Sequence, residues 1–109
     1  MPSGSNAWIS AYLAQTRSRV GVYLTFSKGP IGDRIFERLK EDSNSINQAL
    51  GVPGVVWESD GKKHWISSRQ SFSGILIEEH REEVRAWLSD RVNRFVTVFR
   101  PRIERLLRE

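Results

Sequence analysis

One run of alternating residues constrains the fold more than any other part of this 109-residue chain. Between positions 20 and 26, large apolar side chains alternate with glycine, tyrosine and threonine: Val20, Val22, Leu24 and Phe26 against Gly21, Tyr23 and Thr25. A period of two places each set on its own face of a β-strand. Residues 8–14 alternate in the same way, and the polar residues 15–18 separate the two runs. Two such runs with a short polar link predict an antiparallel hairpin.

The next segment repeats at helical spacing. Pro30 suits the first turn of a helix, because the N–H that proline lacks has no partner there. Apolar residues then recur on one stripe: Ile31, Ile35, Leu39, Ile46 and Leu50, with Phe36 and Ala49 widening it. Gly51 is a natural left-handed stop, and Pro53 prevents continuation. We expect one helix over residues 31–50.

A second hairpin is expected around residues 55–66. Residues 55–58 and 64–66 are β-branched and aromatic, and Asp60-Gly61 lies between them. An Asp-Gly pair in this position predicts a tight turn with positive φ at both residues. Asp60 and Lys62 also have the acid-x-lysine spacing of the metal-dependent PD-(D/E)xK nucleases. In that class, however, the pair lies within one strand and both side chains reach the same side. We interpret the pair here as a turn.

After a loop at residues 71–74, a long amphipathic helix is expected. Its apolar stripe repeats about every 3.6 residues and comprises Val84, Trp87, Leu88, Val92, Phe95, Val98 and Phe99. Carboxylates favour the positive end of the helix dipole, and the first turns hold Glu78, Glu79, Glu82 and Glu83. Pro101 removes a backbone donor and should kink or break this helix, with Ile103, Leu106 and Leu107 continuing the apolar face.

This element order, ββαββα, predicts a two-layer α+β fold. A four-stranded antiparallel sheet made of two hairpins would be covered on one face by two helices. The length suits a single domain, which we place at residues 8–109 after a flexible lead-in at residues 1–7. The residues expected to face the helices are Ile9, Leu13, Val20, Val22, Leu24 and Phe26. Trp8, Tyr12 and Tyr23 should then lie on the opposite, uncovered face.

The composition narrows the classes of function. The chain has no cysteine, which excludes disulfides and thiolate metal sites and is compatible with a cytoplasmic location. No apolar run approaches the roughly 18 residues of a membrane span, so we expect no membrane partner. The net charge is +4, and the excess belongs to the N-terminal segment, where residues 1–30 contain Arg17, Arg19 and Lys28 and no acidic residue.

The sequence carries no recognisable catalytic motif. It has neither a glycine-rich phosphate loop nor a Gly-x-Ser-x-Gly elbow, so we expect no enzyme and no cofactor. His64 and His80 fall on different elements, and a metal site needs three or four convergent ligands. A hydrolase in which either histidine acts as a general base stays as a minor alternative.

The arginines of the last helix invite a DNA-binding interpretation. Arg85, Arg91 and Arg94 flank the apolar stripe, whereas Glu82, Glu83, Asp90 and Glu104 are expected on the far side. Long arginine stems normally cover the edges of a core, and interleaved acids weaken the attraction to phosphate. We interpret this surface as a solvated face of mixed charge.

The uncovered face of the sheet is the stronger candidate site. The candidate residues are the aromatic Trp8, Tyr12 and Tyr23 and the basic Arg17, Arg19 and Lys28. Aromatic rings interleaved with basic side chains stack bases and track phosphates. An exposed aromatic patch equally marks a protein interface. Partial cover by the N-terminal segment is the third alternative, and the residue types by themselves do not separate the three.

Several short motifs resemble those of a known family. They are residues 19–24 (RVGVYL), residues 35–39 (IFERL) with Ile46, the pairs Leu50-Gly51 and Trp57-Glu58, the late Trp87, Phe95, Phe99 and Pro101-Arg102, and the lead-in Ser3-Gly4-Ser5. These motifs span nearly the whole chain. They resemble the uncharacterised bacterial family known as domain of unknown function 4268.

This resemblance has implications for function. Members of the family commonly carry the domain at the C-terminus of a longer protein, behind a region that looks like a PD-(D/E)xK nuclease. The resemblance therefore implies a non-catalytic accessory domain of a DNA-processing or defence protein. The expected partners are DNA or an upstream nuclease-like domain, and a second copy of the chain if the exposed aromatic patch is a dimer interface. The alternative function is a protein-interaction or homodimerisation module with no nucleic-acid contact.

Overall fold

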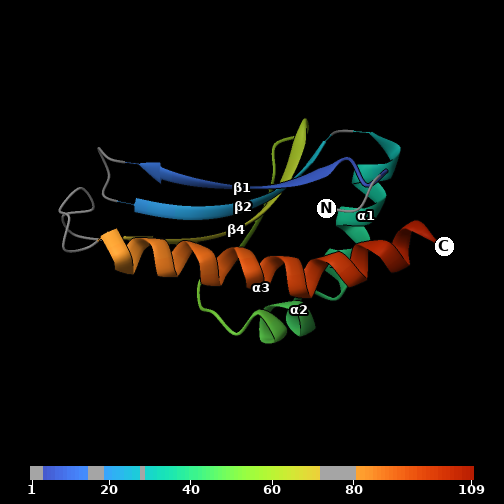
Figure 1. The fold of residues 1–109 in the computed structure, drawn as a ribbon. Coiled ribbons are helices and arrows are strands. Elements are labelled where there is room, and N and C mark those ends of the chain that lie inside the picture. Colours follow the sequence, from blue (N-terminus) through green and yellow to red (C-terminus); the bar gives the residue numbers. More distant parts are fainter. Residues whose placement is uncertain (1–3, 15–18, 28, 72–80) are drawn as a thin grey trace.

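The computed structural model describes residues 4–14, 19–27, 29–71 and 81–109 (Figure 1). The elements are β1 (Ala7–Ala14), β2 (Arg19–Ser27), α1 (Pro30–Glu41), α2 (Ser43–Leu50), β3 (Val56–Ser59), β4 (Lys63–Ser71) and α3 (Arg81–Leu107). The fold is α+β with a four-stranded antiparallel sheet, as expected. The element order, however, is ββααββα, because two helices rather than one separate the hairpins.

The sheet joins the two predicted hairpins through their longer strands. β1 pairs with β2, β3 pairs with β4, and β2 pairs with β4, so the order across the sheet is β1-β2-β4-β3. β2 therefore lies at the centre, with β1 and β3 at the edges. This position explains the strict alternation of β2, because a central strand under helices must send every second side chain into the core.

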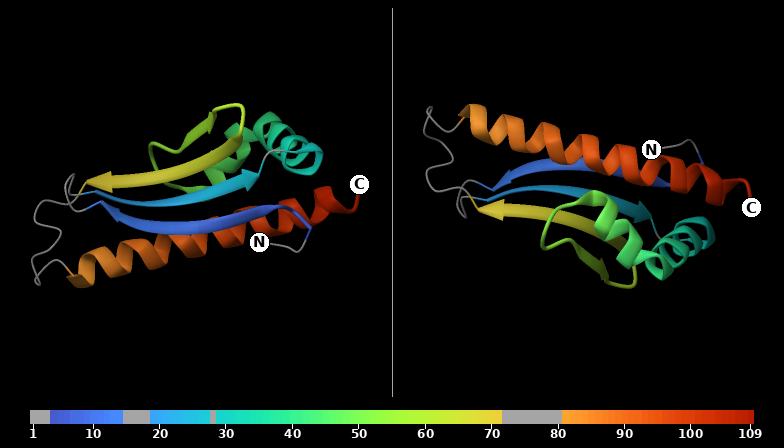
Figure 2. Two further views of the ribbon diagram at one scale, coloured as in Figure 1. Left: turned by 90° about the horizontal axis from the view of Figure 1, so that it is seen from above. Right: turned by 90° about the horizontal axis from the view of Figure 1, so that it is seen from below.

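The helices lie on one side of the sheet (Figures 1 and 2). α3 runs along the strands, α1 lies against the end of β2 and β4, and α2 packs against α3. No described helix covers the opposite side, so the two-layer arrangement is confirmed. Within the described ranges, no helix has the length and apolar character needed to cross a lipid bilayer.

One apolar core fills the space between the layers. The sheet and helices contribute Val22, Leu24, Phe26, Ile35, Phe36, Leu39, Ile46, Leu50, Ile66, Phe95, Val98, Phe99, Ile103 and Leu106. Phe99 is central: its ring centroid lies 5.4 Å from that of Phe95 and 6.3 Å from that of Trp57. Burial of such side chains stabilises the fold by roughly 25 cal/mol for each Å² of apolar surface removed from water.

The expected single helix over residues 31–50 is wrong, because the chain turns at Asp42. The Asp42 N–H bonds to the carbonyl of Leu39 at 3.0 Å and closes α1, and its own carbonyl accepts from the Ile46 N–H at 2.9 Å to begin α2. Residues 42–45 are Asp, Ser, Asn and Ser. These side chains compete for backbone hydrogen bonds and weaken a helix interior. The predicted stop is confirmed, since Gly51 is left-handed with φ of 67°.

Pro101 does not break the last helix. α3 is continuous from Arg81 to Leu107 with Pro101 inside it. Proline cannot donate to the carbonyl four residues earlier and crowds that turn. Beside it, a guanidinium N–H of Arg102 donates to the carbonyl of Val98 at 2.7 Å. The carbonyl that Pro101 leaves without its backbone donor is that of Thr97, and the Arg102 side chain bonds to the next carbonyl of the same turn.

The sheet residues expected to face the helices do so, with one difference in burial. Val20, Val22, Leu24 and Phe26 are fully buried, and Ile9 packs at the edge of the core. Leu13 is 53% exposed, although it lines a shallow apolar groove with Val84, Leu88 and Val92 of α3. Because β1 is an edge strand, its outer end receives less cover than β2.

Candidate nucleic-acid interface

The register of the sheet determines which side chains share the uncovered face. Trp8 lies opposite Thr25 and Tyr12 opposite Gly21, which puts both rings of β1 on the same face as Arg19 and Tyr23 of β2. We call this uncovered surface the open face. The pairing of β2 with β4 adds Lys63, Trp65 and Arg69 to it, together with Ser67 and Ser71. Glu58 of β3 joins them, because it lies opposite Trp65.

Two tyrosines form the centre of the open face. The rings of Tyr12 and Tyr23 are stacked, with centroids 5.2 Å apart and planes 15° from parallel. The Tyr12 ring lies above Gly21, since a Cβ at that glycine would come within 2.3 Å of Cε1 of Tyr12. The absence of a side chain at Gly21 therefore lets Tyr12 lie flat on the sheet. A stack of this kind adds about 0.5–1.5 kcal/mol to the burial of the rings.

The environment of the stack changes the acidity of Tyr12. Burial raises the pKa of the Tyr12 hydroxyl above its usual 10.0, and a hydrogen bond and the neighbouring charge of Tyr23 raise it further. The guanidinium groups of Arg69 and Arg19 oppose these effects by lowering the same pKa. Tyr12 is therefore neutral at physiological pH and presents an uncharged ring beside two arginines.

Two tryptophans border the stack. Trp8 and Trp65 lie on either side of Thr25, which is only 5% exposed although it lies on the open face. The ammonium group of Lys63 sits 5.8 Å from the centroid of the Trp8 ring, a cation–π distance. Trp8 is itself 41% exposed. The rings thus cover the backbone of β2 while offering their outer surfaces to a ligand.

A hollow of about 250 Å³ opens among Tyr23, Glu58, Trp65 and Arg69. A guanidinium nitrogen of Arg69 lies 4.0 Å from a carboxylate oxygen of Glu58. Both side chains keep contact with solvent, at 35% and 52% exposed, so this pair contributes little to stability. A second hollow of about 260 Å³, lined by Arg19, Arg69, Gln70 and Ser71, continues toward the far end of the strands.

The sequence identified half of this surface. Trp8, Tyr12, Arg19 and Tyr23 share the open face. Arg17 and Lys28 lie outside the described residues. Lys63, Trp65, Arg69 and Glu58 were not predicted as site residues; the alternation of residues 63–71 was the available signal for the first three, and Glu58 lies on β3. Their relevance depends on β4 pairing with β2, a contact between residues more than 35 positions apart.

The acid-x-lysine pair is a turn, as interpreted. A carboxylate oxygen of Asp60 accepts from the N–H groups of both Lys62 and Lys63, each at 2.8 Å. These two hydrogen bonds lower the pKa of the Asp60 carboxyl. The expected positive φ at both central residues is wrong, because Gly61 has φ of 85° and Asp60 does not share this conformation. An Asp side chain that bonds to the N–H two residues on stabilises the turn without needing that conformation.

His64 lies on the helix side of the sheet, within a small polar cluster. One ring nitrogen, Nε2, lies 2.7 Å from a carboxylate oxygen of Asp33, and the other, Nδ1, lies 2.7 Å from Oγ of Ser59. The ring stacks on Phe36, with centroids 4.5 Å apart. In serine hydrolases, Nε2 faces the serine and Nδ1 the carboxylate, the reverse of this order. The cluster joins the β3–β4 hairpin to α1. His80 lies outside the described residues.

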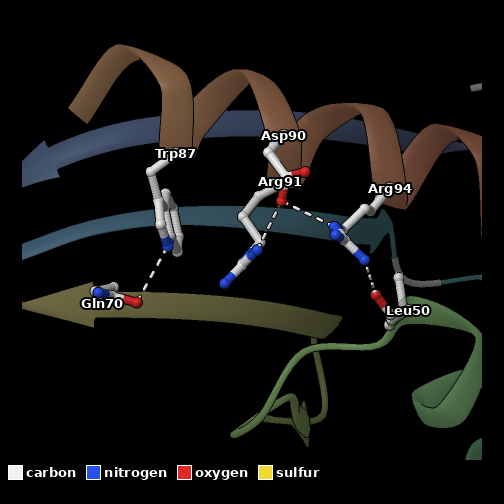
Figure 3. A network of polar contacts seen from close by, with 6 residues as sticks. All are labelled: Leu50, Gln70, Trp87, Asp90, Arg91 and Arg94. Carbon is white, nitrogen blue, oxygen red and sulfur yellow. Dashed lines mark hydrogen bonds and ion pairs between the residues drawn. The ribbon is translucent and has the colours of Figure 1, made fainter. Parts of the chain in front are cut away.

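Two arginines of α3, Arg91 and Arg94, make contacts that hold the fold together (Figure 3). Arg94 donates to the last carbonyl of α2, at Leu50, at 2.9 Å and to Asp90 at 2.8 Å. Arg91 pairs with the same carboxylate at 2.7 Å and lies 4.9 Å from the centroid of the Trp87 ring. Asp90 was expected on the far side of the helix, but it lies between these two arginines, which lower its pKa.

Comparison with known proteins identifies a family and no function. No curated protein and no solved structure matches the chain. The sequence model described as "Domain of unknown function (DUF4268)" matches residues 4–103, which include all four strands and most of α3. The chain therefore belongs to the DUF4268 family, as its motifs suggested.

Proposed function

We propose that this domain is a non-catalytic accessory domain that binds single-stranded nucleic acid, DNA in the first instance, through the open face. The observation that carries the proposal is the Tyr12–Tyr23 stack bordered by Trp8 and Trp65 on a side of the sheet without helices. Four rings on one pleated surface offer successive platforms for unpaired bases. The basic residues among them supply the attraction to phosphate that such binding requires.

The charge distribution supports this proposal. Among the described residues, the open face carries Arg19, Lys63 and Arg69 against the single carboxylate of Glu58. Several arginines of α3, by contrast, pair with acids of the same helix, as in Arg85–Glu82 and Arg100–Glu104. The open face thus combines its aromatic rings with more basic than acidic side chains.

The family suggests a setting for this activity. We infer that the domain assists a nuclease-like region encoded beside it in a bacterial DNA-processing or defence protein, by holding a strand for that region. In this setting the open face binds either DNA directly or the neighbouring domain. Any catalytic residues would belong to the neighbouring region.

A salt series tests direct binding. Fluorescence anisotropy with a labelled (dT)12 strand should give an affinity whose logarithm falls with log salt at a slope near −2, about −0.7 for each of three neutralised phosphates. Arg19→Ala should weaken binding and make the slope shallower, and Arg17→Ala should weaken it as well. Arg85→Ala on α3 is the matched control and should change neither quantity. Absence of binding at low salt would exclude direct contact.

A second experiment separates stacking from charge. Tyr23→Leu keeps an apolar side chain but removes the aromatic surface, and base stacking contributes roughly 1–3 kcal/mol per base. We expect about a tenfold loss of affinity or more with an unchanged salt slope. Duplex DNA of the same length should bind more weakly than the single strand, because paired bases offer no faces to the rings.

The alternative is a protein-interaction or homodimerisation module. It is favoured by the exposure of Trp8 and Leu13 on β1, an edge strand whose outer backbone groups lack a partner strand in the sheet. Sedimentation at high concentration would then show a dimer, and Trp8→Ser or Tyr23→Ser would dissociate it. A strictly monomeric protein would leave only a different protein as partner.

A further inference from the structure

The hollow among Tyr23, Glu58, Trp65 and Arg69 has features that general stacking does not need. Two rings supply apolar walls, whereas the other two side chains supply one carboxylate and one guanidinium. Its volume of about 250 Å³ lies below the 300–1,000 Å³ of pockets for drug-sized ligands. The size suits one planar group inserted between the side chains.

Glu58 is an unusual residue on a surface that attracts phosphate. A carboxylate repels the nucleic-acid backbone, so it lowers affinity unless it makes a contact of its own. An ionised carboxylate only accepts hydrogen bonds, and its two oxygens take two parallel donors. Arg69 only donates, and its guanidinium lies 4.0 Å from the Glu58 carboxylate. The hollow therefore presents an acceptor pair next to a donor.

We propose that this hollow holds one unpaired guanine base of the bound strand. Guanine has two adjacent donors, the N1–H and the exocyclic N2 amine, which match the two oxygens of Glu58. Its O6 and N7 are acceptors, the edge that arginine recognises most often in DNA. Adenine places an acceptor at N1, thymine and uracil have a single N–H between two carbonyls, and cytosine offers only its amine next to an acceptor. Guanine alone gives both oxygens of Glu58 a donor and still offers Arg69 an acceptor, whereas each of the other bases offers Glu58 a single donor on the same edge.

This inference rests on the proposed function, because it assigns a base preference to the same surface. Tyr23 and Trp65 hold the base by stacking, which accepts any base. Glu58 and Arg69 then select guanine by its edge. Since both polar side chains are partly exposed, the selection should lie at the low end of what a bidentate contact gives, roughly tenfold.

The test compares the affinity of the intact domain for four strands that differ at one base. Each strand is (dT)12 with dG, dA, dC or dT at the centre, and binding is measured by fluorescence anisotropy. The central dG strand should bind roughly tenfold more tightly than the other three. Glu58→Gln should abolish this preference while leaving or improving the affinity for (dT)12, because it removes a negative charge. Glu37→Gln, an exposed acid on α1, is the matched charge control and should keep the preference.

Other outcomes would overturn the assignment. Equal affinity for all four strands would reject guanine selection and leave the proposed function intact, whereas no binding of any strand would reject both. A preference that survives Glu58→Gln would move base recognition away from this hollow. Free GMP tests the source of the base: binding as tight as that of the dG strand would identify a nucleotide site and reject a strand-binding site. Thermal melting of each variant shows that the fold is retained.

Discussion

Tyr12 stacks on Tyr23 directly above the backbone of Gly21, in the middle of the open face. The ring centroids lie 5.2 Å apart, and a methyl group at position 21 would overlap the Tyr12 ring at 2.3 Å. Glycine in a strand normally weakens the strand, because it loses backbone entropy and packs no side chain. Here the ring of the facing tyrosine occupies the space that a side chain would take. The surface proposed to bind bases therefore depends on a residue with no side chain.

A double-mutant cycle tests this relationship. Gly21→Ala alone should destabilise the domain by about 1 kcal/mol or more, because the added methyl displaces the Tyr12 ring from the sheet. In a Tyr12→Ala background the same change should stabilise it by about 0.5–1 kcal/mol, the ordinary gain of alanine over glycine in a strand. Urea unfolding of the four proteins gives the coupling. Equal effects of Gly21→Ala in both backgrounds would show that the ring does not occupy this space.

The raised pKa of Tyr12 predicts a loss of stability at high pH. A tyrosine whose pKa is higher in the folded state than in the unfolded state favours folding while it is protonated. Below pH 10, the pKa of tyrosine in the unfolded state, this contribution to stability is present in full. It is lost as the pH rises through the higher pKa of Tyr12 in the folded state. As the pH rises above 10, the midpoint of urea unfolding should fall more steeply in the native protein than in Tyr12→Phe. Parallel curves would mean that burial and Tyr23 leave the acidity of Tyr12 unchanged.

Pro101 and Arg102 should be coupled, because they affect neighbouring carbonyls of one helical turn, those of Thr97 and Val98. Pro101→Ala should stabilise α3 by about 1 kcal/mol or more, less than the ~3 kcal/mol that proline costs inside an ordinary helix. Arg102→Met keeps most of the stem but removes the donor at 2.7 Å, and it should cost about 1 kcal/mol while Pro101 is present. With alanine at position 101 the cost of Arg102→Met should be smaller. Thermal unfolding of the four combinations measures the difference.

Phe99 is a core residue that joins α3 to β3, so its removal should destabilise the whole domain. It is fully buried and touches both Phe95 of its own helix and Trp57 of β3. Phe99→Ala should lower the free energy of unfolding by about 3–5 kcal/mol, a large part of the 5–15 kcal/mol typical of a domain. Thr97→Ala, an exposed change on the same helix, should stay within about 0.5 kcal/mol. If Phe99→Ala lowers the free energy of unfolding no more than Thr97→Ala does, Phe99 is not part of the core.

The β3–β4 turn should lose stability in acid. The backbone N–H groups of Lys63 and Lys62 hold the pKa of Asp60 below its usual 3.8, so its contribution is present above that pH. As the pH falls through the folded pKa, protonation weakens both hydrogen bonds and the contribution is lost. Asp60→Asn keeps an acceptor oxygen and should retain the turn at all pH values, whereas Asp60→Ala should melt earlier than the native protein at pH 7. The difference in stability between the native protein and Asp60→Ala should shrink as the pH falls below 3.8.

The sequence predicted the features that depend on neighbouring residues. The alternation of Val20, Val22, Leu24 and Phe26 defined β2 and its buried face, and Gly51 ended the second helix where expected. Period and turn chemistry act over a few residues, so they can be read without knowing the rest of the fold. The long helix was also correct, although its proline lies within a continuous element.

Tertiary structure decided the features that join distant segments. The apolar spacing of residues 31–50 suits one helix as well as two, so the polar run at residues 42–45 weakened the helix locally without fixing where it would end. The pairing of β2 with β4 brought Trp65 and Arg69 beside Tyr23, and the pairing of β3 with β4 added Glu58. Residue types and periods determined which face each side chain takes within its own strand. Which strands meet across the sheet depends on the core that the two hairpins and three helices bury together, so the composition of the open face was settled only when the whole chain had folded.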